Sequence, residues 1–230
     1  MSQPQKIRAI ITGATGMVGE GVLHECLKHP RVESVLVINR KPIGFSHPKL
    51  REIVHLDFYN FSSIEGELKN YNACFFCLGV TSIGKEEAEY FKLTNTLTLA
   101  LAKPLSQLNP EMTFCYVSGA STDSTEKGRT MWARVKGKTE NDLMKLPFKK
   151  VLAFRPGFIK PIKGLKNVHS FYKYINWMYP IGRALAPGKF CTLKEIGDAM
   201  IHSIDVKEDR KILEGKDIIE LAKGKNPKGV

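Results

Sequence analysis

The stretch T-G-A-T-G-M-V-G, residues Thr12–Gly19, decides the fold. It follows the apolar run Ile7–Ile11, which is typical of a buried strand, and it opens a segment with helical spacing. Three glycines at three-residue spacing let a chain turn sharply, approach a pyrophosphate and pack the new helix closely. The start of that helix offers unpaired N–H groups and positive dipole charge to phosphate. This context predicts a dinucleotide site, whereas the alternative is a strand-to-helix turn without a ligand.

Residues of this turn are expected to contact the cofactor: Gly13, Thr15, Gly16, Met17, Val18 and Gly19.

Apolar and β-branched runs alternate with segments of helical spacing along the next 140 or so residues. The strands are expected at residues 6–12, 34–39, 52–56, 73–78, 112–118 and 150–154. The clearest helices are expected at residues 16–29, 85–108 and 130–146. Such alternation predicts an α/β protein with a Rossmann-type, doubly wound parallel sheet, whose ligands bind beyond the carboxyl ends of the strands.

The C-terminal part of the chain is less regular. We expect a single domain over residues 1–230, with a small, irregular, proline-rich substrate-side lobe at residues 156–190. A helix at residues 192–204 and a short last strand at residues 217–221 are predicted to follow. The aromatic stretch at residues 171–179 fits core packing, and equally a substrate wall, a dimer face or a membrane-surface contact.

Composition limits the possible partners. The net charge of +12 is spread along the chain, so solvated surface charge is favoured over a nucleic-acid partner. Five cysteines, an odd number, and a first strand that starts by about Lys6 argue against secretion and predict a cytoplasmic protein. No apolar run approaches the roughly 18 residues that a membrane span needs. Cys74 and Cys77 are expected on opposite faces of a strand, and we predict no metal site.

The end of the second strand selects the cofactor. Arg40, with Lys41 beside it, would attract a 2′-phosphate, whereas an acidic residue would accept from a free 2′-hydroxyl, so NADP(H) is predicted over NAD(H). Asp57 and Phe58 could border the adenine, and the alternative is a turn aspartate and a core phenylalanine. Beyond the fourth strand, the backbone is expected to pass close to the middle of the cofactor at Leu78, Gly79 and Val80.

The order and spacing of six short motifs resemble the short-chain dehydrogenase/reductases of the atypical type. The motifs are T-G-A-T-G-M-V-G, I-N-R-K, C-L-G-V-T, Y-V-S-G, V-K-G-K-T-E and F-R-P-G-F. Within that superfamily, the chain most resembles the NAD(P)H-binding group similar to the Tat-interacting oxidoreductase-like proteins. The resemblance implies a Rossmann domain that binds NADP(H), with Ser118 orienting the substrate and Lys136 binding the ribose. It also implies a nicotinamide pocket lined by Arg155, Pro156 and Gly157, with Phe158 beside them.

The proton donor of that family is missing. The family places a tyrosine four residues before the lysine, and here Trp132 stands there. The indole N–H does not release a proton near neutral pH, so Trp132 cannot act as a general acid. Another group could supply the proton, the reaction could need no protein acid, or the protein could bind cofactor without turnover. The candidate replacements are Lys136, Tyr90, Tyr116, Tyr172 and Tyr179.

We therefore expect an NADP(H)-dependent oxidoreductase that acts on an unidentified small or hydrophobic acceptor. The alternative from another class is a non-catalytic, NADP(H)-sensing regulatory protein, which Trp132 favours. A sugar-nucleotide epimerase fits the fold but needs the same absent tyrosine. The resemblance to this superfamily also implies a homodimer.

Overall fold

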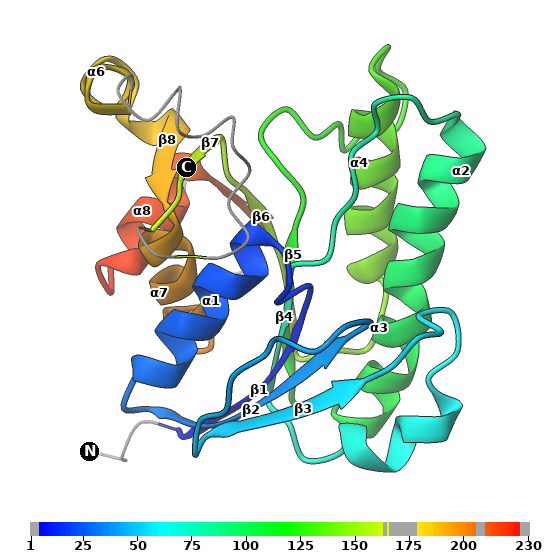
Figure 1. Ribbon diagram of the computed structural model, residues 1–230. Coiled ribbons are helices and arrows are strands. Elements are labelled where there is room, and N and C mark those ends of the chain that lie inside the picture. The colour runs from blue at the N-terminus through cyan, green and yellow to red at the C-terminus, as the bar shows by residue number, and fades with distance from the viewer. Residues whose placement is uncertain (1–4, 163–164, 166–178, 206–209, 226–230) are drawn as a thin grey trace.

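Seven parallel strands form the central sheet in the order β3-β2-β1-β4-β5-β6-β9 (Figure 1). The computed structural model describes residues 5–162, 165, 179–205 and 210–225. The strands are β1 (Ile7–Thr12), β2 (Val32–Asn39), β3 (Leu50–Val54), β4 (Ala73–Phe76), β5 (Thr113–Val117), β6 (Lys150–Arg155) and β9 (Ile212–Glu214). The strand order reverses at β1, which lies between β2 and β4, and ligands bind beside such a switch point in open α/β sheets.

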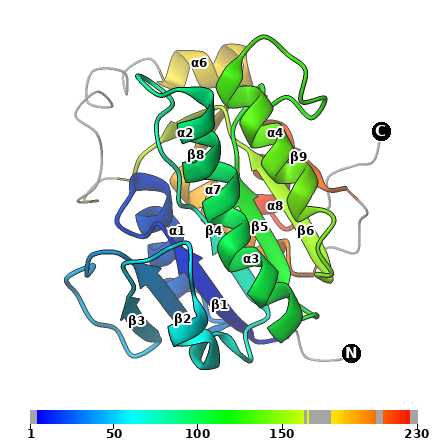
Figure 2. The ribbon, with the colours of Figure 1, turned by 90° about the vertical axis from the view of Figure 1, so that its right-hand side faces the viewer.

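Helices cover both faces of the sheet, which confirms the predicted doubly wound α/β fold (Figures 1 and 2). One face carries α1 (Met17–Lys28), α7 (Leu193–His202) and α8 (Gly215–Ala222). The other carries α2 (Glu87–Phe91), the π-helical η2 (Lys92–Thr96), α3 (Leu97–Leu108) and α4 (Met131–Leu143). A short 3₁₀ helix, η1 (Ser62–Leu68), precedes β4.

Alternation along the strands supplies a separate core to each face. On β1, Ile11 packs into the cluster beneath α1 and α7, while Ile10 packs into the cluster beneath α3. As predicted, Cys74 and Cys77 lie on opposite faces of the sheet. Cys74 belongs to the cluster beneath α3, and Cys77 packs against the cluster beneath α1 and α7. All five cysteines, each within the described residues, are free.

The predicted last strand at residues 217–221 is wrong, because this segment forms most of helix α8. The strand is the shorter β9, immediately before it. Glu214 and Asp217 form a capping box, in which each side chain accepts from the backbone N–H of the other residue. The apolar pair Ile218 and Ile219 resembles a strand in isolation, but both side chains are buried on the inner face of a helix.

The predicted lobe at residues 156–190 contains regular structure that the sequence analysis did not anticipate. β7 (Phe158–Lys160) pairs in parallel with β8 (Phe190–Thr192), and α6 (Tyr179–Leu185) and η4 (Pro187–Lys189) lie between them in the chain. Of the aromatic stretch at 171–179, only Tyr179 is within the described residues, and Tyr172 lies outside them. The helix predicted at 192–204 is confirmed as α7, which Thr192 caps.

None of the helices in the described ranges is both long enough and apolar enough to cross a membrane.

Helix α4 approaches the loop after β5 so closely that only glycine fits at position 137. A Cβ atom at Gly137 would lie 1.8 Å from the Asp123 carbonyl oxygen. We expect Gly137→Ala to lower the free energy of unfolding by about 1–3 kcal/mol, because the helix or the loop must move. Urea unfolding measures this change. Gly66→Ala is the matched control, since nothing lies within 4 Å of its added Cβ, and equal unfolding midpoints for the two variants would contradict the packing argument.

Candidate functional site

The glycine-rich turn between β1 and α1 is shaped by two close backbone approaches. Gly13 has a φ of +73°, and a Cβ there would lie 2.7 Å from the Leu78 backbone nitrogen. A Cβ at Gly19 would lie 2.2 Å from the Gly13 carbonyl oxygen. Gly16 is the N-cap of α1, and no side chain of the described residues caps this helix start. The turn therefore leaves the first N–H groups of α1 to an external acceptor, as a phosphate site requires.

A central cavity of about 640 Å³ lies between this helix start, α4 and the carboxyl ends of β4, β5 and β6. It brings together most of the residues predicted from the sequence: Gly16, Met17, Val18, Gly79, Val80, Ser118, Lys136, Pro156 and Gly157. The sequence analysis missed other lining residues, namely Cys77, Val117, Gly119, Ala120 and Ile159. A signal was available for four of them, because Cys77, Val117, Gly119 and Ile159 each lie beside a predicted site residue. Ala120, two residues after Ser118, had no such signal.

Lys136 and Ser118 meet at one wall of the central cavity. The Lys136 ammonium donates to the Ser118 backbone oxygen, and the Ser118 hydroxyl donates to the Phe154 backbone oxygen at 3.2 Å. Burial lowers the pKa of Lys136 to about 8, although the nearby Glu140 carboxylate opposes this shift. The ammonium is therefore a desolvated donor that faces the cavity.

Trp132 lines the same cavity one helical turn before Lys136. The described tyrosines do not replace the missing hydroxyl. Tyr116 and Tyr90 are 2% exposed, and burial raises the pKa of each. Tyr179 packs its ring near Phe190, with a centroid distance of 6.2 Å. None of these three is among the residues that line the central cavity.

A second cavity, of about 760 Å³, lies at the end of β2 and is called here the β2-end cavity. It is lined by Thr15, Asn39, Arg40, Lys41, Pro42, Leu56 and Leu78. Thr15 lies here, while the next residue, Gly16, lines the central cavity, so one turn borders both. Arg40 and Lys41 are exposed, which leaves their charges available to an anion.

Asn39 is a residue that the sequence analysis missed. Its side-chain oxygen accepts from the Ala14 N–H at 3.1 Å, which ties the end of β2 to the glycine-rich turn. The signal was its place 20 or so residues after the last glycine, where dinucleotide sites carry the residue that contacts the ribose.

The structure does not bring Asp57 and Phe58 into the β2-end cavity. Asp57 accepts from the Tyr59 N–H at 2.9 Å, as a turn residue does, and Phe58 is buried against Phe61. These contacts are those of the alternative interpretation of the sequence, a turn aspartate and a core phenylalanine. The exposed Leu56 lines the cavity instead.

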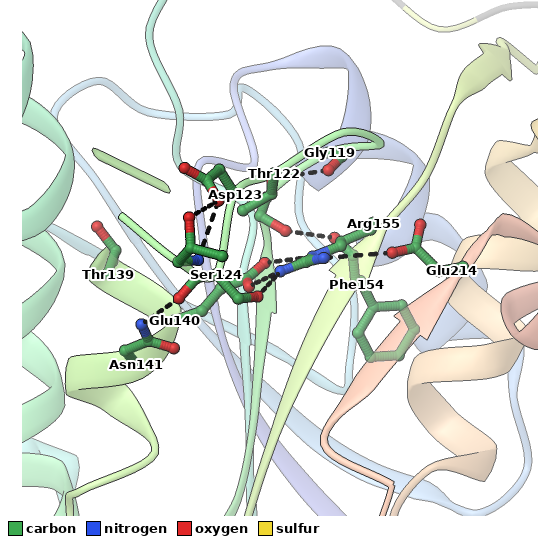
Figure 3. Close-up of polar contacts among 12 residues, drawn as sticks. Gly119, Thr122, Asp123, Ser124, Thr139, Glu140, Asn141, Phe154, Arg155 and Glu214 are labelled. Carbon is green, nitrogen blue, oxygen red and sulfur yellow. Dashed lines mark hydrogen bonds and ion pairs between the residues drawn. The ribbon is translucent and has the colours of Figure 1, made fainter. Parts of the chain in front are cut away.

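Unlike Pro156 and Gly157, Arg155 is not among the residues that line the central cavity. Figure 3 shows Arg155 between Glu140 and Glu214. Arg155 is 8% exposed and forms ion pairs with Glu140 of α4 and Glu214 of β9. It also donates to the Ser124 hydroxyl at 2.5 Å. Together with Phe158, it borders a third cavity, of about 520 Å³, beside β8 and the start of α8.

Within the described ranges, no group of three or more His, Cys, Asp or Glu side chains is placed to hold a metal ion.

A family model links this geometry to known proteins. The model of the NAD dependent epimerase/dehydratase family matches residues 9–130, more than half of the chain, including the glycine-rich turn and Ser118.

Curated relatives include the mitochondrial protein FMP52 of Saccharomyces cerevisiae, 30% identical over 156 residues, which cover 66% of this chain and 65% of the relative. The mitochondrial protein FMP52-2 of Scheffersomyces stipitis is 29% identical over 153 residues, 66% of each chain. The matched part thus spans about two thirds of these relatives. Their names contradict the predicted cytoplasmic location, which was wrong because free cysteines exclude oxidising compartments without distinguishing among reducing ones.

Solved structures share the fold. The Bordetella bronchiseptica enzyme WbmG in complex with NAD superposes with a TM-score of 0.67 at 13% identity, covering 96% of this chain and 79% of that one. Glucuronic acid dehydrogenase from Chromohalobacter salexigens also has a TM-score of 0.67, at 12% identity, covering 96% and 85% of the two chains. With the strand order, the glycine-rich turn and the family match in agreement, the chain belongs to the NAD dependent epimerase/dehydratase family.

Proposed function

We propose that the protein is an NADP(H)-dependent oxidoreductase of the atypical short-chain dehydrogenase/reductase type, similar to the Tat-interacting oxidoreductase-like group. The observation that carries the proposal is the pair of adjoining cavities with the uncapped start of α1 beside them. Arg40 and Lys41 line one cavity, and Lys136 lines the other. WbmG, a protein of the same fold, was solved in complex with NAD, which supports a nicotinamide dinucleotide as the ligand. The acceptor we propose is small or hydrophobic.

The residues present fit such a cofactor. The first N–H groups of α1 would donate to its diphosphate, because Gly13 and Gly19 hold the turn open to a phosphate and no described side chain occupies the helix start. Arg40 and Lys41 would pair with a 2′-phosphate in the β2-end cavity. Lys136 would donate to the ribose hydroxyls next to the nicotinamide. The bound cofactor would supply the hydride.

The proton needs another source than the family's tyrosine. Trp132 donates a hydrogen bond but keeps its proton, and Tyr90 and Tyr116 are buried in the core. Among the described residues that line the cavity, Lys136, with its lowered pKa, is the group that can release a proton near neutral pH. Bulk water is the other source that we propose. We therefore propose acceptors such as quinones or flavins, which take a proton from water, over carbonyls that need a positioned acid.

A second candidate function is favoured by Trp132 itself. A protein that binds NADP(H) without turnover, and reports the redox state to a partner, needs the glycine-rich turn and Lys136 but no general acid. Epimerase chemistry is less well supported, since it needs the hydroxyl that Trp132 replaces.

Calorimetry with NADPH and NADH tests the cofactor. Arg40→Ala should weaken NADPH binding by about 1.5–3 kcal/mol and leave NADH binding nearly unchanged, because only NADPH loses a charge-assisted contact. Arg51→Ala removes the same charge from the exposed face of β3, where Arg51 pairs with Glu67, and should change neither affinity. Equal losses for both cofactors in Arg40→Ala would refute the NADP(H) preference, and no heat with either cofactor in the wild type would refute the proposed function.

Lys136→Met tests the desolvated ammonium. A folded-state pKa of about 8, below the ordinary 10.5, means that folding disfavours the charged form, so wild-type stability rises as the pH rises from about 8 to 10.5. At pH 7 the methionine variant should be more stable than the wild type, by on the order of 1–3 kcal/mol, and this advantage should shrink above the folded-state pKa. NADPH affinity should fall. Unfolding at neutral and alkaline pH measures this, and a variant equally destabilised at both would contradict it.

Trp132→Tyr tests whether the remaining geometry supports carbonyl chemistry. It restores a hydroxyl one turn before Lys136, and NADPH-dependent reduction of a carbonyl panel should rise by about 100-fold or more if the substrate side is intact. Consumption of NADPH with carbonyls, quinones and flavins is compared with that of the wild type. Trp132→Phe, which adds no hydroxyl, is the control. The sensor is supported if the wild type binds NADPH but does not consume it with any acceptor tested, and if Trp132→Tyr brings no gain.

A further inference from the structure

The third cavity, of about 520 Å³, adjoins the central cavity on the side of the C-terminal part of the chain. Ala120 and Gly157 line both cavities. The Ala120 N–H donates to the Pro156 backbone oxygen at 2.9 Å, so a backbone contact forms the border between them. Because the two cavities share this border, one extended ligand can occupy both.

Glycines shape one wall of the third cavity, because three stretches of backbone approach one another closely there. A Cβ at Gly157 would lie 2.3 Å from the Lys189 carbonyl oxygen, and one at Gly215 would lie 2.2 Å from the Gly188 carbonyl oxygen. A Cβ at Gly188 would lie 3.2 Å from the Lys216 Cβ. These contacts hold Lys189, from η4, and Lys216, from α8, at the same cavity.

The same two lysines lack a counter-ion. Lys189 and Lys216 are exposed, and neither forms an ion pair with another described residue. Glu214, the carboxylate among the lining residues, pairs with Arg155. Hydrogen bonds from an ammonium group to an anion are among the stronger polar contacts in proteins. The lysines therefore favour a ligand that carries an anionic group.

Aromatic rings form another part of the wall. Phe158 of β7 and Phe190 of β8 pair in register, and their ring centroids are 5.5 Å apart. Both residues line the third cavity, and Phe190 directly follows Lys189. Because aromatic side chains stack favourably on planar rings, this wall suits a conjugated ring next to the anionic group.

We propose that the third cavity binds the outer part of the acceptor, and that this acceptor is a planar, conjugated molecule with an anionic group such as a phosphate, carboxylate or sulfonate. This inference rests on the proposed function and narrows its acceptor to quinones or flavins with an acidic substituent. The ring lies against Phe158 and Phe190, and the anionic group accepts from Lys189 and Lys216. The anion positions the acceptor and takes no part in the transfer of hydride.

Two matched pairs of probes, bound to the protein saturated with NADP⁺, test this inference. FMN and riboflavin share one ring system and differ by a phosphate. Anthraquinone-2-sulfonate and 2-(hydroxymethyl)anthraquinone differ by a sulfonate. NADP⁺ is the oxidised cofactor and has no hydride to give, so calorimetry reports affinity alone. The charged member of each pair should bind at least about tenfold more tightly than the neutral one, and a preference within the flavin pair alone would assign the anion site to phosphate.

The double variant Lys189→Met with Lys216→Met identifies the source of this preference. It should bring the charged probes to the affinity of their neutral partners and leave the neutral ones unchanged. Lys211→Met with Lys225→Met is the matched control, because it removes the same charge from exposed residues that do not line the cavity. This control should match the wild type. If the four lysines are solvated surface charges alone, the two double variants will behave alike, which overturns the inference.

Phe158→Leu tests the ring contact. It removes one ring of the wall and keeps both lysines, so all four probes should weaken by a similar factor. Unchanged affinities in this variant would contradict the contact with the ring.

The failure of the inference can be told apart from the failure of the proposed function. Equal affinity within both pairs, or no binding of any probe to the NADP⁺-bound protein, overturns the inference alone. A wild type that does not bind NADP⁺ overturns the proposed function. The same probes and the two double variants, measured without cofactor, then still report whether the third cavity binds anions.

Discussion

The contact between Gly19 and the Gly13 carbonyl is the constraint on which the site depends. Because a Cβ at Gly19 would lie 2.2 Å from that oxygen, α1 can approach the turn this closely only if residue 19 lacks a side chain. This close approach points the start of α1 at the carboxyl edge of the sheet. The two cavities lie on either side of the turn, so the position of one helix start fixes where any extended ligand crosses the molecule.

Helix α4 gives three different roles to three residues at four-residue spacing. Trp132 and Lys136 line the central cavity, while Glu140, on the same face, turns to Arg155 in the interior. The carboxylate that could have paired with Lys136 is thereby held by a guanidinium. Burial then dominates the pKa of Lys136 and lowers it. A buried ion pair next to the cavity thus influences the protonation of a residue that it does not touch.

Sequence patterns predicted what depends on local periodicity: the alternation of strands and helices, the glycine-rich turn and most of the residues at strand ends that line the central cavity. They failed where partners distant in the chain decide the outcome. Arg155 ends β6, directly before Pro156 and Gly157, but it pairs with Glu140 and Glu214 and is not among the residues that line the central cavity. Phe58 has the aromatic ring expected of an adenine contact, yet this ring packs on Phe61. The link from Asn39 to the glycine-rich turn became visible only in the structure, through its bond to Ala14.

The ion pairs of Arg155 also have a consequence for cooperativity. β9 has three residues and pairs only with β6 among the described strands, so this edge of the sheet has few backbone bonds of its own. Arg155 joins it to α4 and to the loop at Ser124. Local opening of the C-terminal edge would break the same network that holds the loop beside the cavity. Amide hydrogens in β9 and around Ser124 should therefore exchange together, as one cooperative unit.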